Sequence, residues 1–197
     1  DDVLHAMAKY ENLCNYIHLP VQSGNSAVLK RMNRGYTREW YLKRIEAIHR
    51  IIPDCAISTD VISGFCGETE MEHDETLSLM DLVKYDFAYM FKYSERPKTL
   101  AERKFEDDVP DEVKSKRLSE IIEKQLKFSL ESNKKRIGLV EKVLIEGESK
   151  RSSEHMCGRT SRNSMVVFPK NKGIKGDYVQ VKINDCTSAT LMGEEIN

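Results

Sequence analysis

The stretch that decides the fold runs from Ser58 to Thr69 and reads Ser-Thr-Asp-Val-Ile-Ser-Gly-Phe-Cys-Gly-Glu-Thr. Its first half is apolar and β-branched around Asp60, and it then breaks at Gly64 and Gly67 before a polar run. This order predicts a buried strand, a glycine turn that lets backbone amides approach a ligand, and a helix capped by Thr69. A carboxylate is costly to bury without a partner, so Asp60 is either a satisfied structural group or part of a small-molecule site.

Strands and helices alternate on both sides of this stretch. Further strands are predicted at 16–20 and 87–93, and helices at 2–14, at 27–32 with Gly35 as its end, at 37–52 and at 70–84. The apolar stripes of the last two helices include Trp40 and Leu82. Such alternation predicts right-handed βαβ crossovers and a parallel sheet, open or curled into a barrel, with a site at the carboxyl ends of the strands.

Three segments follow these predicted strand ends and should therefore converge on one edge. They are Gln22 with Ser23, the segment 60–65, and the segment from Lys92 to Arg96. Their polar groups could hold a ligand with charges of both signs. Turn chemistry and surface charge explain each residue singly about as well, so only convergence in space would favour a ligand site.

The last third of the chain has a different pattern. Pro110 opens a long helix at about 110–136, with acids at its start and bases at its end, as the helix dipole favours. After Gly138, short strands are predicted at 140–146, 165–168, 178–183 and 188–192, which indicates a small β-barrel or sandwich. We expect two domains, 1–133 and 134–197, with the long helix linking them.

The second expected domain is basic. From Lys134 onward, twelve Lys and Arg stand against eight Asp and Glu, a net charge of +4, whereas residues 1–133 carry −5. A basic small barrel suits nucleic acid because cations gain phosphate contacts and release counterions, although a solvated rim is the simpler alternative. The polar loop residues are Lys150, Arg151, Arg159, Arg162, Asn163, Lys170, Lys172 and Lys175.

Composition excludes other classes. The net charge is −1 with 32% charged residues, and no apolar run is long enough to span a bilayer. The five cysteines lie far apart, which argues against a metal site built from this chain alone and favours reduced thiols in the cytoplasm. His155 and Cys157 are two residues apart, a spacing compatible with a metal pair, but a loop position is the more probable interpretation of this segment.

Several long motifs in fixed order resemble the radical S-adenosylmethionine methylthiotransferases. Besides Ser58 to Thr69, they are His-Leu-Pro-Val-Gln-Ser-Gly at 18–24, Leu-Lys-Arg-Met-Asn-Arg-Gly-Tyr-Thr-Arg at 29–38 and Tyr-Ser-Glu-Arg-Pro-Lys-Thr at 93–99. The segment from Gly138 is similar to the TRAM domain that closes these enzymes. The resemblance implies the second half of a partial (β/α) TIM-like barrel, a linking helix and an OB-like RNA-binding barrel. Two positions depart from the family: Cys66 stands for the usual Pro, and Lys98 for the usual Gly.

The forms of two motifs favour the tRNA branch of the family. Ser23 and Arg96 match the branch that modifies an adenosine next to the anticodon, whereas the branch that modifies a ribosomal-protein aspartate has other residues there. The implied reaction replaces the C2 hydrogen of N6-isopentenyladenosine at position 37 by a methylthio group. Two alternatives stay open: the ribosomal-protein branch, and a non-catalytic RNA-binding module.

The resemblance also implies cofactors and partners. Full-length members use S-adenosylmethionine, two 4Fe–4S clusters and a flavodoxin-type or ferredoxin-type reductant, and the cluster cysteines have no counterpart in this sequence. We therefore expect a C-terminal part, monomeric, without catalytic residues or metal ligands, and inactive alone. Carried over by motif, the cofactor contacts are Gln22, Ser23, Asp60, Gly64 and Phe91, the substrate contact is Arg96, and the contacts to the tRNA anticodon stem-loop are Lys150, Arg151, Arg159, Arg162, Asn163 and Lys170.

Overall fold

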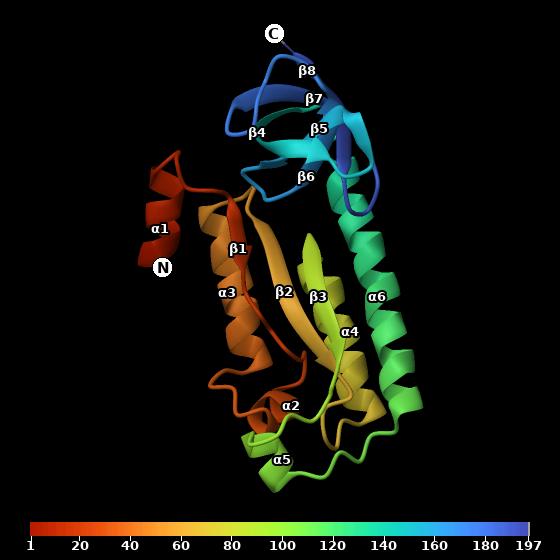
Figure 1. Ribbon diagram of the computed structural model, residues 1–197. Helices are drawn as coiled ribbons and strands as arrows, with labels where there is room; N and C mark the ends of the chain where they lie inside the picture. The colour runs from red at the N-terminus through yellow and green to blue at the C-terminus, as the bar shows by residue number, and fades with distance from the viewer. Residues whose placement is uncertain (197) are drawn as a thin grey trace. The chain divides into compact units, whose positions relative to one another are not determined.

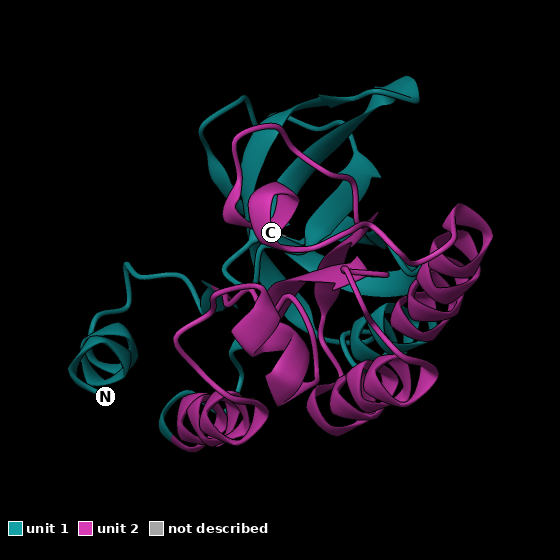
Figure 2. Ribbon diagram, turned by 90° about the horizontal axis from the view of Figure 1, so that it is seen from below, with its two compact units in different colours: residues 1–17, 51–56, 127–197 teal, residues 18–50, 57–126 magenta. Residues whose placement is uncertain are grey.

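The computed structural model describes residues 1–196, and the chain forms two compact units within it (Figure 2). The first unit comprises residues 1–17, 51–56 and the chain from 127 onward; the second comprises residues 18–50 and 57–126. Helix α6 (Asp111–Lys134) contributes residues to both. The expected domain boundary at 133/134 therefore falls within the first unit.

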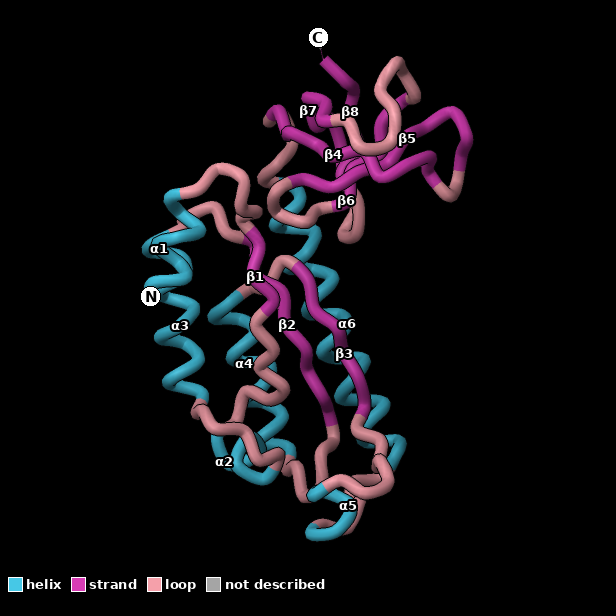
Figure 3. The backbone as a smooth tube through the Cα atoms, turned by 60° about the vertical axis from the view of Figure 1, so that its left-hand side comes forward, coloured by secondary structure: helices cyan, strands magenta, loops and turns pink. Residues whose placement is uncertain are grey.

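A three-stranded sheet in the order β1 (Tyr16–His18), β2 (Ala56–Ser63) and β3 (Phe87–Lys92) lies mainly in the second unit, which holds His18, β2 from Ile57 onward and all of β3. Strands β2 and β3 are parallel, with Ser58 opposite Phe87 and Ser63 opposite Lys92. Helices α3 (Arg38–Ile51), α4 (Glu70–Val83) and the first part of α6 cover one face of this sheet (Figures 1 and 3). The parallel α/β arrangement predicted from the alternating pattern is confirmed.

Local sequence signals explain where several helices begin. Thr69 caps α4 with a capping box, because its side chain accepts from the amide of Glu72 while the Glu72 carboxylate accepts from the Thr69 amide. Asn25 caps α2 (Ser26–Arg31) by accepting from the amides of Ala27 and Val28. The expected end of this helix at Gly35 is wrong, since α2 stops at Arg31 and Asn33 takes the left-handed conformation with φ 58°.

Some expected inward residues face solvent instead. Trp40 and Leu82 are exposed, whereas their helices bury Tyr41, Ile45 and Ile48 on α3 and Leu79, Met80 and Val83 on α4. Periodicity shows where an apolar stripe runs along a helix but not how far it extends around the helix. Packing against the sheet decides which residues at the margins of the stripe are covered. Helix α1 (Asp2–Lys9) is shorter than the expected 2–14 and buries no residue. A short helix, α5 (Leu100–Lys104), follows β3.

The closed barrel of the first unit has strand order β4-β5-β6-β8-β7. Its strands are β4 (Val140–Ser149), β5 (Ser152–Thr160), β6 (Met165–Pro169), β7 (Tyr178–Cys186) and β8 (Leu191–Ile196). Alternate residues of these strands face inward and form one apolar core, which consists of Val143, Ile145, Met156, Val166, Phe168, Val181, Ile183 and Leu191. This confirms the predicted small barrel.

One strand of the barrel is not predicted by the sequence pattern. Residues 152–160 were expected as a loop that carries His155, Cys157 and Arg159, yet they form β5, which pairs with β4 on one side and β6 on the other. The segment is too polar to show strand periodicity. Gly158 fits there because a Cβ at this position would lie 2.2 Å from the Leu144 carbonyl oxygen. The last strand also differs: it was expected at 188–192 and runs from Leu191 to Ile196.

Candidate functional site

The three segments predicted to converge do so at the carboxyl ends of the strands of the second unit. The Gln22 amide donates to the Asp60 carbonyl at 2.8 Å, and the Ile62 amide donates to the Gln22 carbonyl at 2.9 Å. On the other side of β2, the Tyr93 amide donates to the Ser63 carbonyl at 2.8 Å. The segments after β1, β2 and β3 thus share one edge, where ligands of parallel α/β sheets bind.

Asp60 lies on the open face of the sheet and has a partner there. Its Oδ1 is 3.4 Å from Nε2 of His18, whose Nδ1 is 2.8 Å from Oγ of Ser58. The His18 ring packs edge-on against Tyr89 at 5.9 Å between centroids. Asp60 is therefore held by a short polar chain and is only partly buried, with 29% of its side chain exposed. Its carboxylate remains reachable by a ligand.

Aromatic rings extend this face along β3. Phe87, Tyr89 and Phe91 alternate along the strand, and each is about half exposed. In the β2–β3 register, Tyr89 stands beside Asp60 and Phe91 beside Ile62. A carboxylate next to exposed rings suits a nucleoside, because rings stack on a base while a carboxylate accepts from hydroxyl or ammonium groups. The residues present therefore fit S-adenosylmethionine.

Ser23 and Gly64 are turned toward the protein instead. Ser23 is fully buried; its Oγ is 3.3 Å from Oγ1 of Thr76 and accepts from the Asn25 amide at 3.2 Å. The Gly64 amide donates to Oε2 of Glu68 at 2.6 Å, and a Cβ on Gly64 would lie 2.3 Å from Cγ of Lys114. The side chain of Ser23 and the amide of Gly64 are thus bound within the protein, where they hold the backbone of this edge in place.

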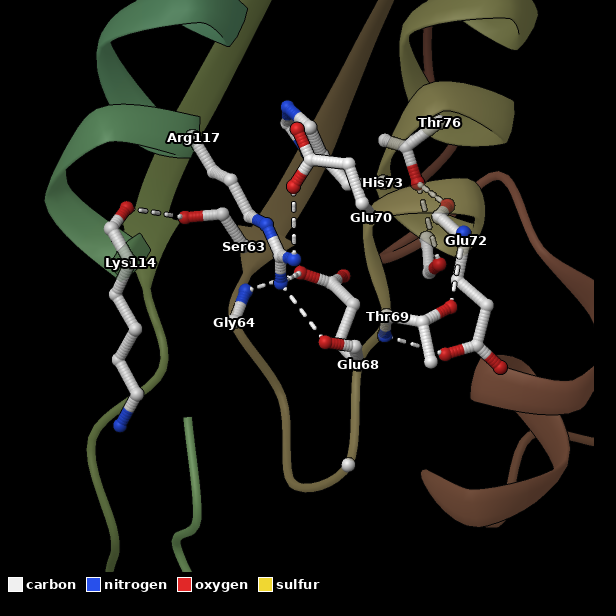
Figure 4. A network of polar contacts seen from close by, with 12 residues as sticks. Ser63, Gly64, Glu68, Thr69, Glu70, Glu72, His73, Thr76, Lys114 and Arg117 are labelled. Carbon is white, nitrogen blue, oxygen red and sulfur yellow. Dashed lines mark hydrogen bonds and ion pairs between the residues drawn. The ribbon is translucent and has the colours of Figure 1, made fainter. Parts of the chain in front are cut away.

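A buried polar network holds the turn after β2 (Figure 4). Arg117 of α6 donates to the Glu68 carbonyl at 2.9 Å and to Glu68 Oε2 at 3.1 Å, and it also donates to Oε2 of Glu70 at 3.1 Å. The side chains of Arg117 and Glu68 are almost completely buried. Burial raises the pKa of Glu68, while the bonds from the Gly64 amide and Arg117 act in the opposite direction. This network fixes the backbone that carries the candidate site.

A cavity of about 260 Å³ opens at the same edge. Its walls include Arg31, Arg34, Ile62, Phe65 and Tyr93. Arg31 binds the Glu72 carboxylate through both terminal nitrogens at 2.8 and 2.9 Å, while its Nε finds no partner among the described residues. Burial raises the pKa of the Tyr93 hydroxyl, which lies near the Cys66 thiol. Within residues 1–196 the Arg34 guanidinium has no hydrogen-bond or ion-pair partner, so the cavity has apolar walls, the paired Arg31 and the unpaired Arg34.

The loop after β3 holds Arg96 and Lys98, one of the two departures from the family motifs, whereas the other, Cys66, lies in the turn after β2. Arg96 is exposed, and its carbonyl accepts from Oγ1 of Thr99 at 2.9 Å. Lys98 has φ 68°, a left-handed conformation that costs a residue with a Cβ about 1–2 kcal/mol, so the usual Gly would fit better. Cys66 is buried in the turn Phe65–Glu68, where Gly67 has φ 69° as a type II turn requires.

In the barrel, most of the expected RNA contacts are engaged by the protein itself. Arg159 donates to the carbonyl of Asn163 at 2.8 Å and pairs with Glu146 at 3.4 Å. Arg162 pairs with Asp54 at 3.0 Å and is mostly buried, and Lys170 pairs with Glu148 at 2.5 Å. Within residues 1–196, the side chains of Lys150 and Arg151 at the β4–β5 turn make no hydrogen bond or ion pair.

The described part of the chain holds neither a cluster of metal-binding side chains nor a membrane-spanning helix. No group of three or more His, Cys, Asp or Glu side chains is placed to hold a metal ion among residues 1–196. None of the helices described there is both long and apolar enough to cross a membrane.

Comparison with known proteins identifies both halves. Residues 1–80 match the family model of the radical SAM superfamily, and residues 134–196 match that of the TRAM domain. The two matched segments account for 80 and 63 of the 197 residues, and both agree with the resemblance drawn from the motifs. The radical SAM part agrees with the parallel sheet, and the TRAM domain with the closed barrel.

Curated relatives extend the match over the whole chain. The tRNA-2-methylthio-N(6)-dimethylallyladenosine synthase of Christiangramia forsetii is 57% identical over 99% of this chain, which covers 40% of that protein. The synthases of Amoebophilus asiaticus and Phocaeicola vulgatus are 58% and 55% identical over 98% and 100% of this chain, which covers 40% and 43% of them. The radical SAM and TRAM parts together therefore span about two fifths of these relatives.

A solved structure supports the fold alone. Coproporphyrinogen III oxidase from Escherichia coli, a radical SAM enzyme, aligns with a TM-score of 0.50 at 18% identity over 85% of this chain and 41% of its own. At this identity the likeness carries the architecture of the radical SAM part and says nothing of substrate.

Sequence reasoning missed three groups that the structure brings to these sites. His18 was quoted only within a motif, yet it is the partner of Asp60. Arg117 looked like an ordinary helix cation, because its partner Glu68 lies 49 residues away. Tyr178 was read only as the start of a strand. One sign of its role was present in the sequence: Arg117 is a charged residue on the apolar face of the helix predicted at about 110–136.

Proposed function

We propose that this chain is the C-terminal part of a tRNA methylthiotransferase that adds a methylthio group to C2 of N6-isopentenyladenosine at position 37 of tRNA. The observation that carries the proposal is the 57% identity to a tRNA-2-methylthio-N(6)-dimethylallyladenosine synthase across 99% of the chain. The convergence of the three strand-end segments supports it, because this edge is the place for a cofactor in such a fold.

The open face of the sheet is the proposed cofactor site of this chain. Asp60, reachable beside His18, would accept from a ribose hydroxyl or the ammonium group, and Phe91 would pack against the adenine. Gln22 is 7% exposed and its backbone groups are bound to Asp60 and Ile62, so it would contribute through its side-chain amide. Ser23 and Gly64 act indirectly by shaping the same edge. When bound, S-adenosylmethionine and two 4Fe–4S clusters, supplied with electrons by a flavodoxin-type or ferredoxin-type protein, provide the radical and methyl-transfer chemistry.

The barrel, assigned here to residues 134–197, is the proposed binding site for the anticodon stem-loop. Lys150 and Arg151, whose side chains have no partner among residues 1–196, lie at one turn and are the strongest of the expected phosphate contacts. Arg159, Asn163 and Lys170 would have to exchange internal partners for phosphate, and Arg162 would contribute least because it is mostly buried. Arg96, exposed in the loop after β3, is the proposed substrate contact.

The proposal places the protein in the cytoplasm, where tRNA is modified, and as a monomer. It assigns no catalytic group to residues 1–197 themselves, so the isolated chain is expected to bind ligands without turning over.

The test of the reaction is mass spectrometry of tRNA nucleosides from cells that lack the parent gene. We expect the methylthio derivative of isopentenyladenosine to disappear while isopentenyladenosine itself accumulates, and the derivative to return when the full gene is restored. Unchanged nucleosides together with loss of a modified ribosomal-protein aspartate would transfer the proposal to the protein-modifying branch.

The test of the cofactor site is Asp60→Asn in the complete enzyme. The carboxylate accepts hydrogen bonds that an amide cannot fully replace, so we expect S-adenosylmethionine affinity to fall about tenfold, equivalent to roughly 1.4 kcal/mol. Circular dichroism should remain unchanged because Asp60 is partly exposed. Equal cofactor affinity, measured by calorimetry, would return Asp60 to a purely structural role with His18.

A further inference from the structure

The outer face of strands β4 and β7 carries an exposed aromatic ring that the barrel does not need. Tyr178 stands opposite Leu144 in the antiparallel register, and 63% of it is exposed. Its neighbours along β7, Val179 and Val181, point inward to the core instead. Among residues 1–196, the Tyr178 hydroxyl has no hydrogen-bond partner. A tyrosine that is this exposed, and whose hydroxyl has no partner among these residues, is available to a ligand.

Lysines surround this ring. Nζ of Lys142 lies 4.7 Å from the centre of the Tyr178 ring, and Lys182 follows on β7 two residues beyond Gln180 on the same face. Lys175 precedes Tyr178 in an exposed loop. In the part of the chain that the structure describes, none of these three ammonium groups has a carboxylate within ion-pair distance.

The six expected RNA contacts of the barrel lack this combination, because most are paired and the others have no ring beside them. Arg159, Arg162 and Lys170 each pair with a carboxylate of the protein. The turn with Lys150 and Arg151 has no aromatic side chain beside it in sequence. The β4–β7 face, defined here by Val140, Lys142, Leu144, Tyr178, Gln180 and Lys182, therefore combines an exposed ring with unpaired positive charge. This combination is what single-stranded nucleic acid needs, since bases stack on rings and cations follow the phosphates.

We propose that the β4–β7 face is the stacking site for one unpaired base of the RNA, with Tyr178 against the base and Lys142 and Lys182 beside the flanking phosphates. The inference rests on the proposed function, because that function supplies an RNA loop as the ligand. It adds a site on a face that carries none of the six expected RNA contacts. The ligand class is single-stranded RNA, and a paired stem has no free base to offer.

The experiment measures binding of the 197-residue chain to two fluorescein-labelled RNAs, an anticodon stem-loop and a fully paired duplex of similar length. Base stacking on an aromatic side chain is lost on truncation, so Tyr178→Ala should weaken stem-loop binding about tenfold. Tyr178→Phe keeps the ring and should bind like the unaltered chain. Duplex affinity should be the same for all three, because no base is free to stack.

A matched control is present on α1. Tyr10 is also about half exposed, with Nζ of Lys9 5.3 Å from its ring centre, but it lies outside the barrel. Tyr10→Ala should leave stem-loop affinity unchanged. Lys142→Ala and Lys182→Ala should each reduce the slope of log affinity against log salt by about 0.7–1, as expected for one lost phosphate contact.

The outcomes separate this inference from the proposed function. If the unaltered chain binds the stem-loop and Tyr178→Ala binds it equally well, the stacking site is wrong while the RNA role stands. If Tyr178→Ala weakens stem-loop and duplex equally, the ring does not distinguish an unpaired base from a paired stem, and base stacking is again wrong. If the unaltered chain binds neither RNA at low salt, the RNA role itself fails and the stacking site with it.

Discussion

The barrel and the strand-end edge of the α/β unit are stabilised in opposite ways. In the barrel, eight buried apolar side chains form the core, and charges lie outside it. At the strand-end edge, hydrogen bonds between buried polar groups hold the structure together. Arg117 binds Glu68, Glu68 binds the Gly64 amide, and the Ser23 hydroxyl contacts that of Thr76. An apolar core tolerates many surface changes, so the outer face of the barrel is free for recognition. A polar network fixes backbone positions near a site but fails when one partner is removed.

The largest effect expected from this comparison is on the barrel core. Phe168 is 1% exposed, so Phe168→Ala should destabilise the barrel by about 4 kcal/mol through lost burial and the cavity left behind. The measurement is urea unfolding, with hydrogen exchange of the barrel strands to locate the effect. Ile174→Ala is the control, because Ile174 is 68% exposed and should change stability by less than about 0.5 kcal/mol. Equal effects of the two would mean that the barrel has no specific core.

The next effect tests the polar network. Arg117→Ala leaves the buried Glu68 carboxylate without its partner, so we expect a loss of about 3 kcal/mol in the free energy of unfolding. Lys116→Ala, one residue earlier on α6, removes an exposed cation 3.7 Å from Glu120 and should cost less than about 0.5 kcal/mol. Adding Glu68→Gln to Arg117→Ala should recover part of the loss. No recovery would show that the buried charge is not the cause.

A smaller effect with the opposite sign is expected in the loop after β3. Lys98→Gly relieves the left-handed backbone conformation at φ 68°, so we expect stabilisation by about 0.5–1 kcal/mol. Asn163, at φ 61°, is the matched position in the barrel; Asn tolerates this conformation better, so Asn163→Gly should gain less. Thermal unfolding of both variants checks the order. A destabilised Lys98→Gly would indicate that the loop changes conformation in solution.

The smallest effect is a dependence on pH. The hydrogen bond from Arg31 lowers the pKa of Glu72 below its ordinary value of 4.5. The folded state therefore binds this proton less readily than the unfolded chain, and the pair's contribution, under about 1 kcal/mol, is present above pH 4.5 and lost as the pH falls through the folded pKa. Urea unfolding of Glu72→Gln between about pH 6 and pH 3 should show a shallower acid decline. An unchanged decline would assign the acid sensitivity to other carboxylates.

Local signals in the sequence were sufficient for much of the fold. Thr69 predicted the start of α4, and the change from helical to short-strand patterning near Gly138 predicted the barrel. These signals work because capping and periodicity involve residues within a few positions of one another. Strand β5 was missed because its polar residues hide the alternation of a strand, and only its pairing with β4 and β6 in the folded barrel shows it to be one.

The sequence by itself determined the family resemblance, the order of strands and helices, and the three segments that meet at the strand ends. Only the tertiary structure decided which polar side chains remain free. Asp60 is reachable beside His18, and Ser23 is bound to Thr76. Arg159 and Lys170 pair with carboxylates, whereas Lys142 contacts the Tyr178 ring and has no carboxylate partner among residues 1–196. The physical reason is distance along the chain. Whether a charge is paired or available depends on which distant element packs against it, and no local pattern records that.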